Sequence, residues 1–149
     1  MTKPGAASGE EDPYRDRYGA SYSIYGDVDV DALLAVAQPS APFEVWRKGE
    51  PVGGGRRTAK TAGVTIDICD DRASVEPAVL RFLMEERVFL TSAAGFVSPT
   101  TWSLLTCRMW VYAAVPSQVV LAPTTVVQLA AARVALEVVG YPCADHPGP

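Results

Sequence analysis

The amino-acid sequence predicts an α+β domain: a single mixed or mostly antiparallel sheet with two or three helices packed on one face. Apolar residues recur with a period of two in some segments and of 3.6 in others, and these segments follow the order β-α-β-β-α-β-β-α-β. A chain of 149 residues is long enough to bury one core of its own.

The first half of the chain is expected to form three strands and a short helix. Alternation over residues 20–25 predicts the first strand. A helix is expected over residues 30–37, with Asp29 positioned to accept hydrogen bonds from the amides of the first turn. Alternation returns over residues 42–48 and 63–69, which predicts two strands joined by a glycine-rich loop.

The second half begins with the clearest expected helix, over residues 74–90, whose apolar residues fall on one face. A long strand over residues 104–113 follows a loop that contains glycine and proline. The remaining expected elements are a short strand over residues 118–121, a helix over residues 123–135 and a closing strand over residues 136–141.

The ends of the chain differ from this pattern. Residues 1–18 are small or charged and lack apolar periodicity, so we expect a disordered arm before a domain of residues 19–142, and a flexible tail of residues 143–149 after it. No segment resembles a membrane span or a signal peptide, which predicts a cytoplasmic protein that does not bind a membrane.

Charge and cysteine content exclude several functional classes. The formal net charge of −4 argues against a nucleic-acid partner. The cysteines Cys69, Cys107 and Cys143 are widely spaced and form no C-x-x-C pair. This favours structural thiols in a reducing compartment over a redox or metal role, and no cofactor is expected.

The segment GGRRTAKT, from Gly54 to Thr61, lies one residue from the phosphate-binding pattern G-x-x-x-x-G-K-[ST], because Ala59 stands where the second glycine belongs. In a phosphate loop a helix begins at the Lys-Thr pair, so that its amides face the phosphates. A strand pattern follows Thr61 here, and a nucleotide site is therefore not expected.

The same loop is strongly basic. Five cations and one acid, Glu50, give a local charge of five minus one, or +4. These charges either solvate a hairpin or form a patch for a small anionic ligand or an acidic partner, since arginine suits carboxylate and phosphate recognition. The cations are Arg47, Lys48, Arg56, Arg57 and Lys60.

Two further patterns argue against metal binding and conventional catalysis. Asp27, Asp29 and Asp31 begin like a calcium loop, but the sixth and twelfth positions lack the required glycine and glutamate, so helix capping is the better explanation. The only histidine, His146, lies in the tail, which removes histidine-activated nucleophiles and zinc sites. A carboxylate pair involving Asp67 remains, and strand-end solvation is the preferred explanation of it; no catalytic residue is predicted.

Alternation in the strand over residues 104–113 places Met109 and Val111 under the helices and Arg108, Trp110 and Tyr112 on the other face. If that face is open, it presents aromatic side chains beside a cation, as interaction surfaces do. Loops or the N-terminal arm could equally cover it. With Trp46, the basic loop and this face make up the predicted partner-binding residues: Trp46, Arg47, Lys48, Arg56, Arg57, Lys60, Arg108, Trp110 and Tyr112.

The strings SIYGDVDVDALL, VWRKGE, GRR and GYPCAD resemble the bacterial family of unknown function DUF4279. The resemblance spans residues 20–142 and is most specific at residues 46–50. It departs from the family pattern at Val64, where an aromatic residue is expected, and at residues 38–40. It implies the fold, and it implies no activity, because the family has none established.

Three functions remain open. The first is a non-catalytic binding protein, immunity-like or accessory, that engages an acidic partner encoded nearby or an anionic ligand. The second is a small-molecule-binding protein or a histidine-free cyclase-type enzyme of bacterial secondary metabolism, using Asp67, Tyr25 and Trp46. The third is a structural module that forms a homodimer through an open sheet face.

Overall fold

The computed structural model describes residues 17–113 and 116–143, which contain four helices, a five-stranded sheet and a two-stranded sheet. The helices are α1 (Val30–Val36), α2 (Glu76–Glu85), α3 (Arg87–Ala94) and α4 (Pro123–Ala131). The strands are β1 (Tyr18–Gly26), β2 (Glu44–Trp46), β3 (Pro51–Val52), β4 (Arg57–Thr58), β5 (Ala62–Arg72), β6 (Thr101–Val111) and β7 (Ala135–Pro142).

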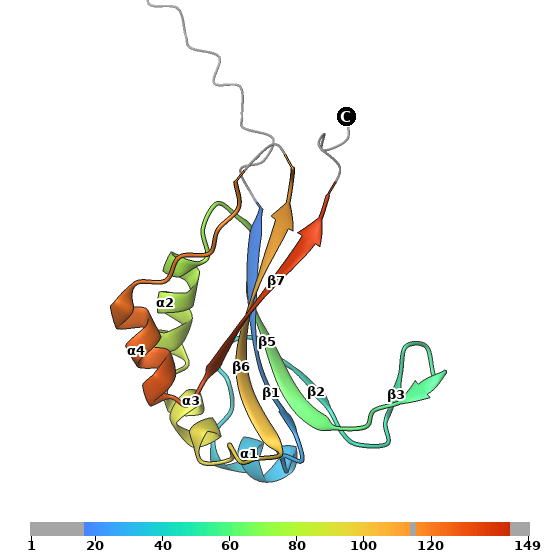
Figure 1. Cartoon of the computed structure of the whole chain (residues 1–149). Helices are drawn as coiled ribbons and strands as arrows, with labels where there is room; N and C mark the ends of the chain where they lie inside the picture. The colour runs from blue at the N-terminus through green and yellow to red at the C-terminus, as the bar shows by residue number, and fades with distance from the viewer. Residues whose placement is uncertain (1–16, 114–115, 144–149) are drawn as a thin grey trace, which may run out of the picture.

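The large sheet has the strand order β2-β5-β1-β6-β7 and is mixed. The pairs β2–β5, β5–β1 and β1–β6 are antiparallel, whereas β6 and β7 are parallel and are connected through α4. Helices α2, α3 and α4 lie on one face of this sheet, and α1 lies at one end of it (Figure 1). The predicted α+β class, with a mixed sheet and helices on one face, is confirmed.

The central strand β1 separates the two faces of the sheet. Tyr18, Ala20, Tyr22 and Ile24 are buried under the helices, and the residues between them point to the opposite face, as the period of two requires. Apolar side chains from the helix side complete the core. The residues predicted to share one face of the long helix are all buried there: Val75, Val79, Phe82 and Leu83.

The predicted single helix over residues 74–90 is wrong, because the chain breaks between α2 and α3 at Glu86. This side chain is only 3% exposed. Its carboxylate accepts hydrogen bonds from the Ser40 amide (2.9 Å), the Ser40 hydroxyl (2.6 Å) and the Ala41 amide (2.8 Å). The break therefore lets one buried carboxylate satisfy the donors of the α1–β2 connection.

Two expectations around α4 are also wrong. Residues 118–121 form no strand, because both neighbouring positions beside β6 are occupied by β1 and β7. The helix ends at Ala131 instead of residue 135, because Arg133 adopts a positive φ of 57° and the Val134 amide bonds back to the Leu129 carbonyl at 2.9 Å. This is a Schellman-type helix end with arginine in the position that glycine usually takes.

The predicted domain limits differ slightly from the structure. Strand β1 begins at Tyr18, inside the segment predicted as an arm, and the Cys143 amide bonds to the Val111 carbonyl at 2.9 Å. The rest of the predicted arm, and the tail with His146, lie outside the described residues. None of the described helices combines the length and apolarity needed to cross a membrane.

Replacement of Glu86 by alanine is expected to lower the free energy of unfolding by about 3 kcal/mol, because three hydrogen-bond donors lose a charged acceptor. Urea denaturation measures this loss. The matched control is Glu85→Ala, since Glu85 is exposed and its carboxylate holds none of these donors. Equal effects of the two substitutions would contradict the role given to Glu86.

Because Tyr22 is buried, we expect the free energy of unfolding to fall at high pH. Burial raises the pKa of its phenol to about 12 from 10.0, against a smaller opposing effect of the 2.8 Å hydrogen bond with Ser103. Above pH 10 the unfolded chain loses this proton while the folded chain keeps it, so the stabilisation present below pH 10 disappears as the pH approaches 12. Raising the pKa from 10.0 to about 12 corresponds to roughly 3 kcal/mol of stability.

The measurement compares the free energy of unfolding of the wild type and of Tyr22→Phe between pH 9 and 12. The advantage of the wild type is expected to shrink over that interval. Parallel pH profiles for the two proteins would show that Tyr22 does not titrate in this way.

Candidate functional site

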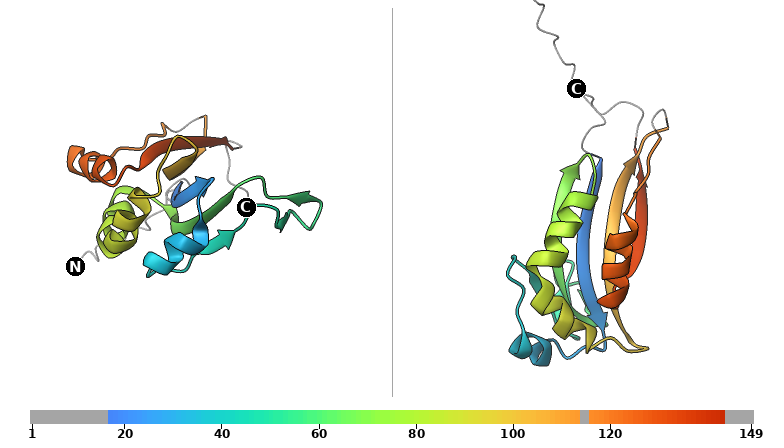
Figure 2. Two further views of the ribbon diagram at one scale, coloured as in Figure 1. Left: turned by 90° about the horizontal axis from the view of Figure 1, so that it is seen from below. Right: turned by 90° about the vertical axis from the view of Figure 1, so that its left-hand side faces the viewer.

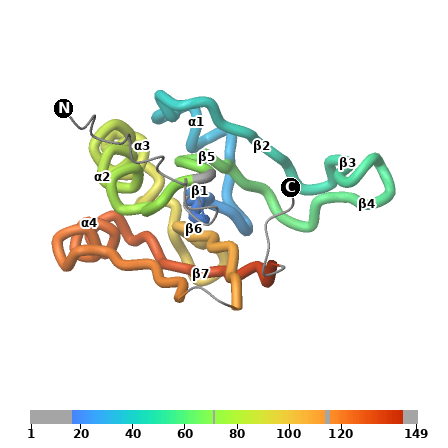
Figure 3. The backbone as a smooth tube through the Cα atoms, turned by 90° about the horizontal axis from the view of Figure 1, so that it is seen from above, coloured from blue at the N-terminus to red at the C-terminus, as the bar shows by residue number. Residues whose placement is uncertain are grey.

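The sheet face opposite α2, α3 and α4 carries no helix among the described residues, and we call it the open face (Figures 2 and 3). The strand registers place alternate residues of β2, β5, β1, β6 and β7 on it. Its centre is polar: Ser23 and Thr65 share a 2.8 Å hydrogen bond, and the Thr106 hydroxyl donates to Glu137 at 3.2 Å. Aromatic side chains lie at both ends.

At one end, one row of cross-strand neighbours on the open face contains Trp46, Gly63, Tyr25 and Trp102. The rings of Tyr25 and Trp102 are 5.8 Å apart. The Trp46 ring lies over Gly63, where a Cβ atom would clash with the indole and stand 2.7 Å from the Ile24 carbonyl oxygen. Glycine at this position therefore allows Trp46 to join the aromatic row.

At the other end, Trp110 and Tyr141 form a second aromatic pair, with ring centroids 6.3 Å apart. Arg108 donates to the Ser21 hydroxyl at 2.9 Å, on the same face as Trp110. Tyr112 lies just beyond the end of β6. The two aromatic ends are eight residues apart along β6, roughly 26 Å. The predicted binding residues thus form two separate groups.

The basic loop forms a hairpin of residues 47–60 around β3 and β4, which we call the basic hairpin. Backbone hydrogen bonds between Gly49 and Ala59 and between Ala59 and Glu50, both 2.8 Å, extend the β3–β4 ladder. Its tip contains three successive glycines with positive φ, a conformation that side-chain-bearing residues rarely adopt. The hairpin projects from the sheet on the side away from the helices (Figures 1 and 3).

Arg47 is the cation at the base of this hairpin, and it has partners within the chain. Its guanidinium contacts Asp31 of α1 at 2.7 Å and Glu50 at 3.6 Å. The hydrogen bond from Arg47 lowers the pKa of the Asp31 carboxyl, and the same bond raises the pKa of Arg47. Both side chains are exposed, so this pair orients the hairpin relative to α1 without adding much stability.

The remaining four cations of the hairpin make no ion pair within the described part of the chain. Arg56, Arg57 and Lys60 border a shallow hollow along the β4 side of the hairpin. Lys48 lies in the turn that follows β2. With Arg47 paired to Asp31 and Glu50, the cations without an ion pair in the described residues lie at both ends of the hairpin: Arg56 and Arg57 near the tip, and Lys48 and Lys60 near the base.

The two near-matches to known motifs behave as the sequence suggests. Strand β4 lies inside the phosphate-loop-like segment and β5 begins at Ala62, so no helix starts at the Lys-Thr pair. Asp29 caps α1 by accepting from the Ala32 amide at 3.0 Å, and Asp31 binds Arg47. Within the residues that the structure describes, no group of three or more His, Cys, Asp or Glu side chains could hold a metal ion.

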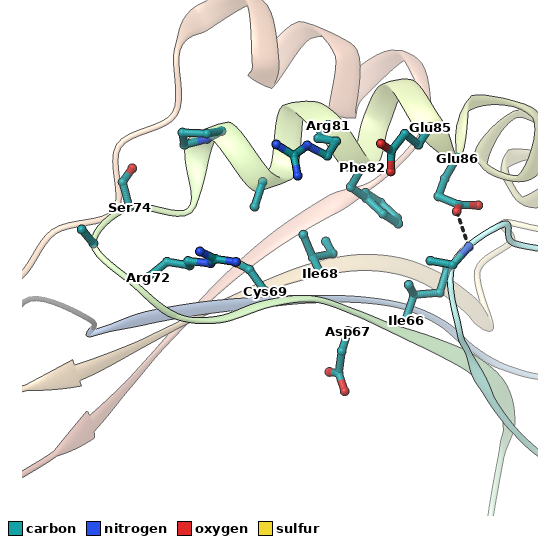
Figure 4. Close-up of a pocket in the computed structure, with 14 residues that line it drawn as sticks. Ile66, Asp67, Ile68, Cys69, Arg72, Ser74, Arg81, Phe82, Glu85 and Glu86 are labelled. Carbon is teal, nitrogen blue, oxygen red and sulfur yellow. Dashed lines mark hydrogen bonds between the residues drawn. The ribbon is translucent and has the colours of Figure 1, made fainter.

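A groove of about 490 Å³ lies between α2 and the outer edge of β5 (Figure 4). Ile66, Ile68 and Phe82 form its apolar wall. Its charged lining is mixed, with the cations Arg72 and Arg81 and the acids Glu85 and Glu86. Asp67 points away from this groove toward the open face in Figure 4. It is also four residues from Gly63 along β5, roughly 13 Å from the aromatic row, so Asp67 is not gathered with Tyr25 and Trp46.

Two thiols, those of Cys69 and Cys107, lie in environments that suppress their reactivity. Burial raises the pKa of Cys107 to about 11, and it also raises the pKa of Cys69. All three cysteines are free. Protonated thiols are poor nucleophiles and metal ligands, which supports the structural role expected for these two residues.

Trp102 and Tyr141 belong to the aromatic ends of the open face but were not among the predicted binding residues, and Tyr25 was named only for the alternative small-molecule site. Trp102 is an even number of residues from Arg108 and Trp110 along β6 and so lies on the same face as they do. Alternation along this strand could therefore have identified it. Tyr25 and Tyr141 become neighbours of the tryptophans only through strand registers, which alternation within a single strand does not reveal.

Comparison with protein-family models, curated proteins and solved structures finds no match for this chain. The resemblance to DUF4279 therefore stays a prediction, and the functional argument rests on the arrangement of the residues.

Replacement of Gly63 by alanine is expected to displace the Trp46 ring and to lower the free energy of unfolding by about 2 kcal/mol, as overpacking typically does. A Trp102→Phe, Trp110→Phe background leaves Trp46 as the only tryptophan, so its emission maximum should shift to longer wavelength. Gly95→Ala serves as the control, because its added Cβ would meet a single atom, the Ser92 carbonyl oxygen at 3.3 Å, a tight contact but far milder than the clash with the Trp46 ring at Gly63. Unchanged Trp46 emission would refute the packing described here.

Proposed function

We propose that this protein is a non-catalytic binding module, immunity-like or accessory, that engages an acidic partner surface in the cytoplasm. The observation that carries the proposal is the joint placement of the aromatic row and the basic hairpin. Trp46 ends β2 in the aromatic row, and the hairpin begins at the next residue on the same side of the sheet (Figure 3). A single partner surface can therefore meet both.

The cations and the aromatic residues would contribute to binding in different ways. The arginines at the hairpin tip, which form no ion pair with the described residues, attract carboxylates and can bind them through two parallel hydrogen bonds. The long-range attraction would also accelerate the encounter with an acidic protein. Trp46, Tyr25 and Trp102 supply the large, rigid apolar contacts that concentrate binding energy in interfaces. A partner encoded nearby, as in immunity pairs, would suit this arrangement.

A second candidate is the binding of a small anionic molecule in the groove between α2 and β5. The volume of about 490 Å³ falls within the usual range for ligand sites. Arg72 and Arg81 form no ion pair within the described residues and could hold an anionic group against the apolar wall. This candidate uses a different surface from the first, so matched substitutions separate the two.

The test is purification of the tagged full chain from its own host, followed by native mass spectrometry of the wild type and two variants. Arg56→Ala with Arg57→Ala removes two charges from the hairpin, whereas Arg72→Ala with Arg81→Ala removes two from the groove. A protein bound at fixed stoichiometry should be lost from the hairpin variant, with affinity reduced at least tenfold, and kept by the groove variant.

Loss of a bound small molecule from the groove variant alone would instead support the second candidate. A protein partner retained equally by both variants would contradict the proposed role of the hairpin.

A further inference from the structure

Most of the sequence after β6 is devoid of charge. From Met109 to Ala132 no residue is charged, and only Arg133 and Glu137 follow before Asp145. Helix α4, which lies within this run, has no charged residue although most of it is exposed. A surface helix normally presents charged or polar residues to water. The uncharged helix therefore indicates a surface that is covered by something else.

Exposed apolar side chains gather on the same part of the fold. Six large apolar residues of α4, of β7 and of the segment before α4 are 45% to 66% exposed, which is half of such residues in the described chain. They are Val120, Val126, Val127, Leu136, Val138 and Tyr141. Tyr141 lies on the open face with Trp110, whereas Leu136 and Val138 lie on the side of α4; an apolar surface such as theirs marks an interaction site.

The flank of α4 that is directed toward β7 belongs to this surface. Gln128, Ala131 and Ala132 lie on the flank that faces α2 and α3, where they border a hollow with Leu83 and Leu90. The helical period then places Val126 and Ala130 on the opposite flank. Leu136 and Val138 share the register of Leu105 and Cys107 and so project on the helix side of β7. We call Val126, Ala130, Leu136 and Val138 the edge surface.

The backbone along the outer edge of β7 could form hydrogen bonds with a further strand. Among the described strands β7 pairs only with β6, so the groups along its outer edge have no strand partner. An exposed edge is usually guarded by charges, bulges or proline. In β7 only Glu137 and the terminal Pro142 could serve this purpose.

The opposite side of the sheet is guarded. Strand β5 is covered by β2 only from Gly63 to Thr65. Beyond that pairing it carries register shifts against β1, and its residues include Asp67, Asp70 and Arg72. Irregular pairing and charge both discourage the addition of a strand. Within residues 17–113 and 116–143, each chain therefore offers one unguarded edge of the large sheet.

We propose that β7 pairs with β7 of a second copy of this chain, in an antiparallel two-fold dimer that joins the two sheets and packs the edge surfaces together. A register centred on Val138 places Val138 opposite its own copy and Glu137 opposite Val139, so no like charges meet. One unguarded edge per chain gives a closed dimer and no filament. This interface differs from the open face, which stays available to another partner.

Sedimentation velocity of the full chain from roughly 1 to 200 µM tests the dimer. The wild type is expected to reach twice the 15.9 kDa of one chain. Val138→Lys places a charge on the edge and should raise the dimer dissociation constant at least tenfold. Met84→Lys is the matched control, because Met84 is 72% exposed on α2 and lies outside the edge surface; this variant should dimerise like the wild type.

Two further measurements keep the test decisive if Val138→Lys fails to fold. Val126→Lys changes only the α4 flank and should also weaken the dimer. Amide exchange in residues 136–141 of the wild type should slow as concentration rises. A wild type that stays monomeric at the highest concentration, a mass above two copies, or equal dimerisation of the Val138, Val126 and Met84 variants would overturn the proposal.

Discussion

Antiparallel pairing of β1 with β5 along one edge and with β6 along the other is the interaction on which the rest of the structure depends. It satisfies the backbone of a buried strand on both sides and sets the registers of its neighbours. A shift of one residue in either pairing would exchange the two faces. Tyr22 would then leave the core, where it packs against Phe82 and Phe89, and Tyr25 would leave the aromatic row.

The helices cover one face only, and this asymmetry determines where binding could occur. Connections from β5 to β6 and from β6 to β7 place α2, α3 and α4 on the same side (Figure 1). The basic hairpin leaves the sheet on the other side, beside Trp46. Arg47 links its base to α1 through Asp31, so the orientation of the hairpin depends on a helix that is distant from its tip. Charge and aromatic surface are thereby combined on one side of the molecule.

One buried and one half-buried carboxylate organise the connections that apolar packing leaves unspecified. Glu86 holds the segment before β2, and Glu76 accepts from the Thr125 hydroxyl at 2.6 Å and the Ala122 amide at 3.2 Å at the start of α4. Both acids look like ordinary surface residues of an amphipathic helix in the sequence. Their roles depend on which loop donors reach them, and this explains why the helix break at Glu86 could not be predicted from periodicity.

The sequence by itself determined the α+β class, most of the strands, the cap at Asp29 and the absence of a phosphate-loop helix, because alternation, helical period and capping are local properties of neighbouring residues. Tertiary structure decided what depends on distant partners. It left residues 118–121 without a place in the sheet, paired Arg47 with Asp31, and brought Tyr25 beside Trp102 while leaving Trp110 at the far end. These outcomes follow from strand order and register, which arise only when remote segments compete for the same edges and the same buried space.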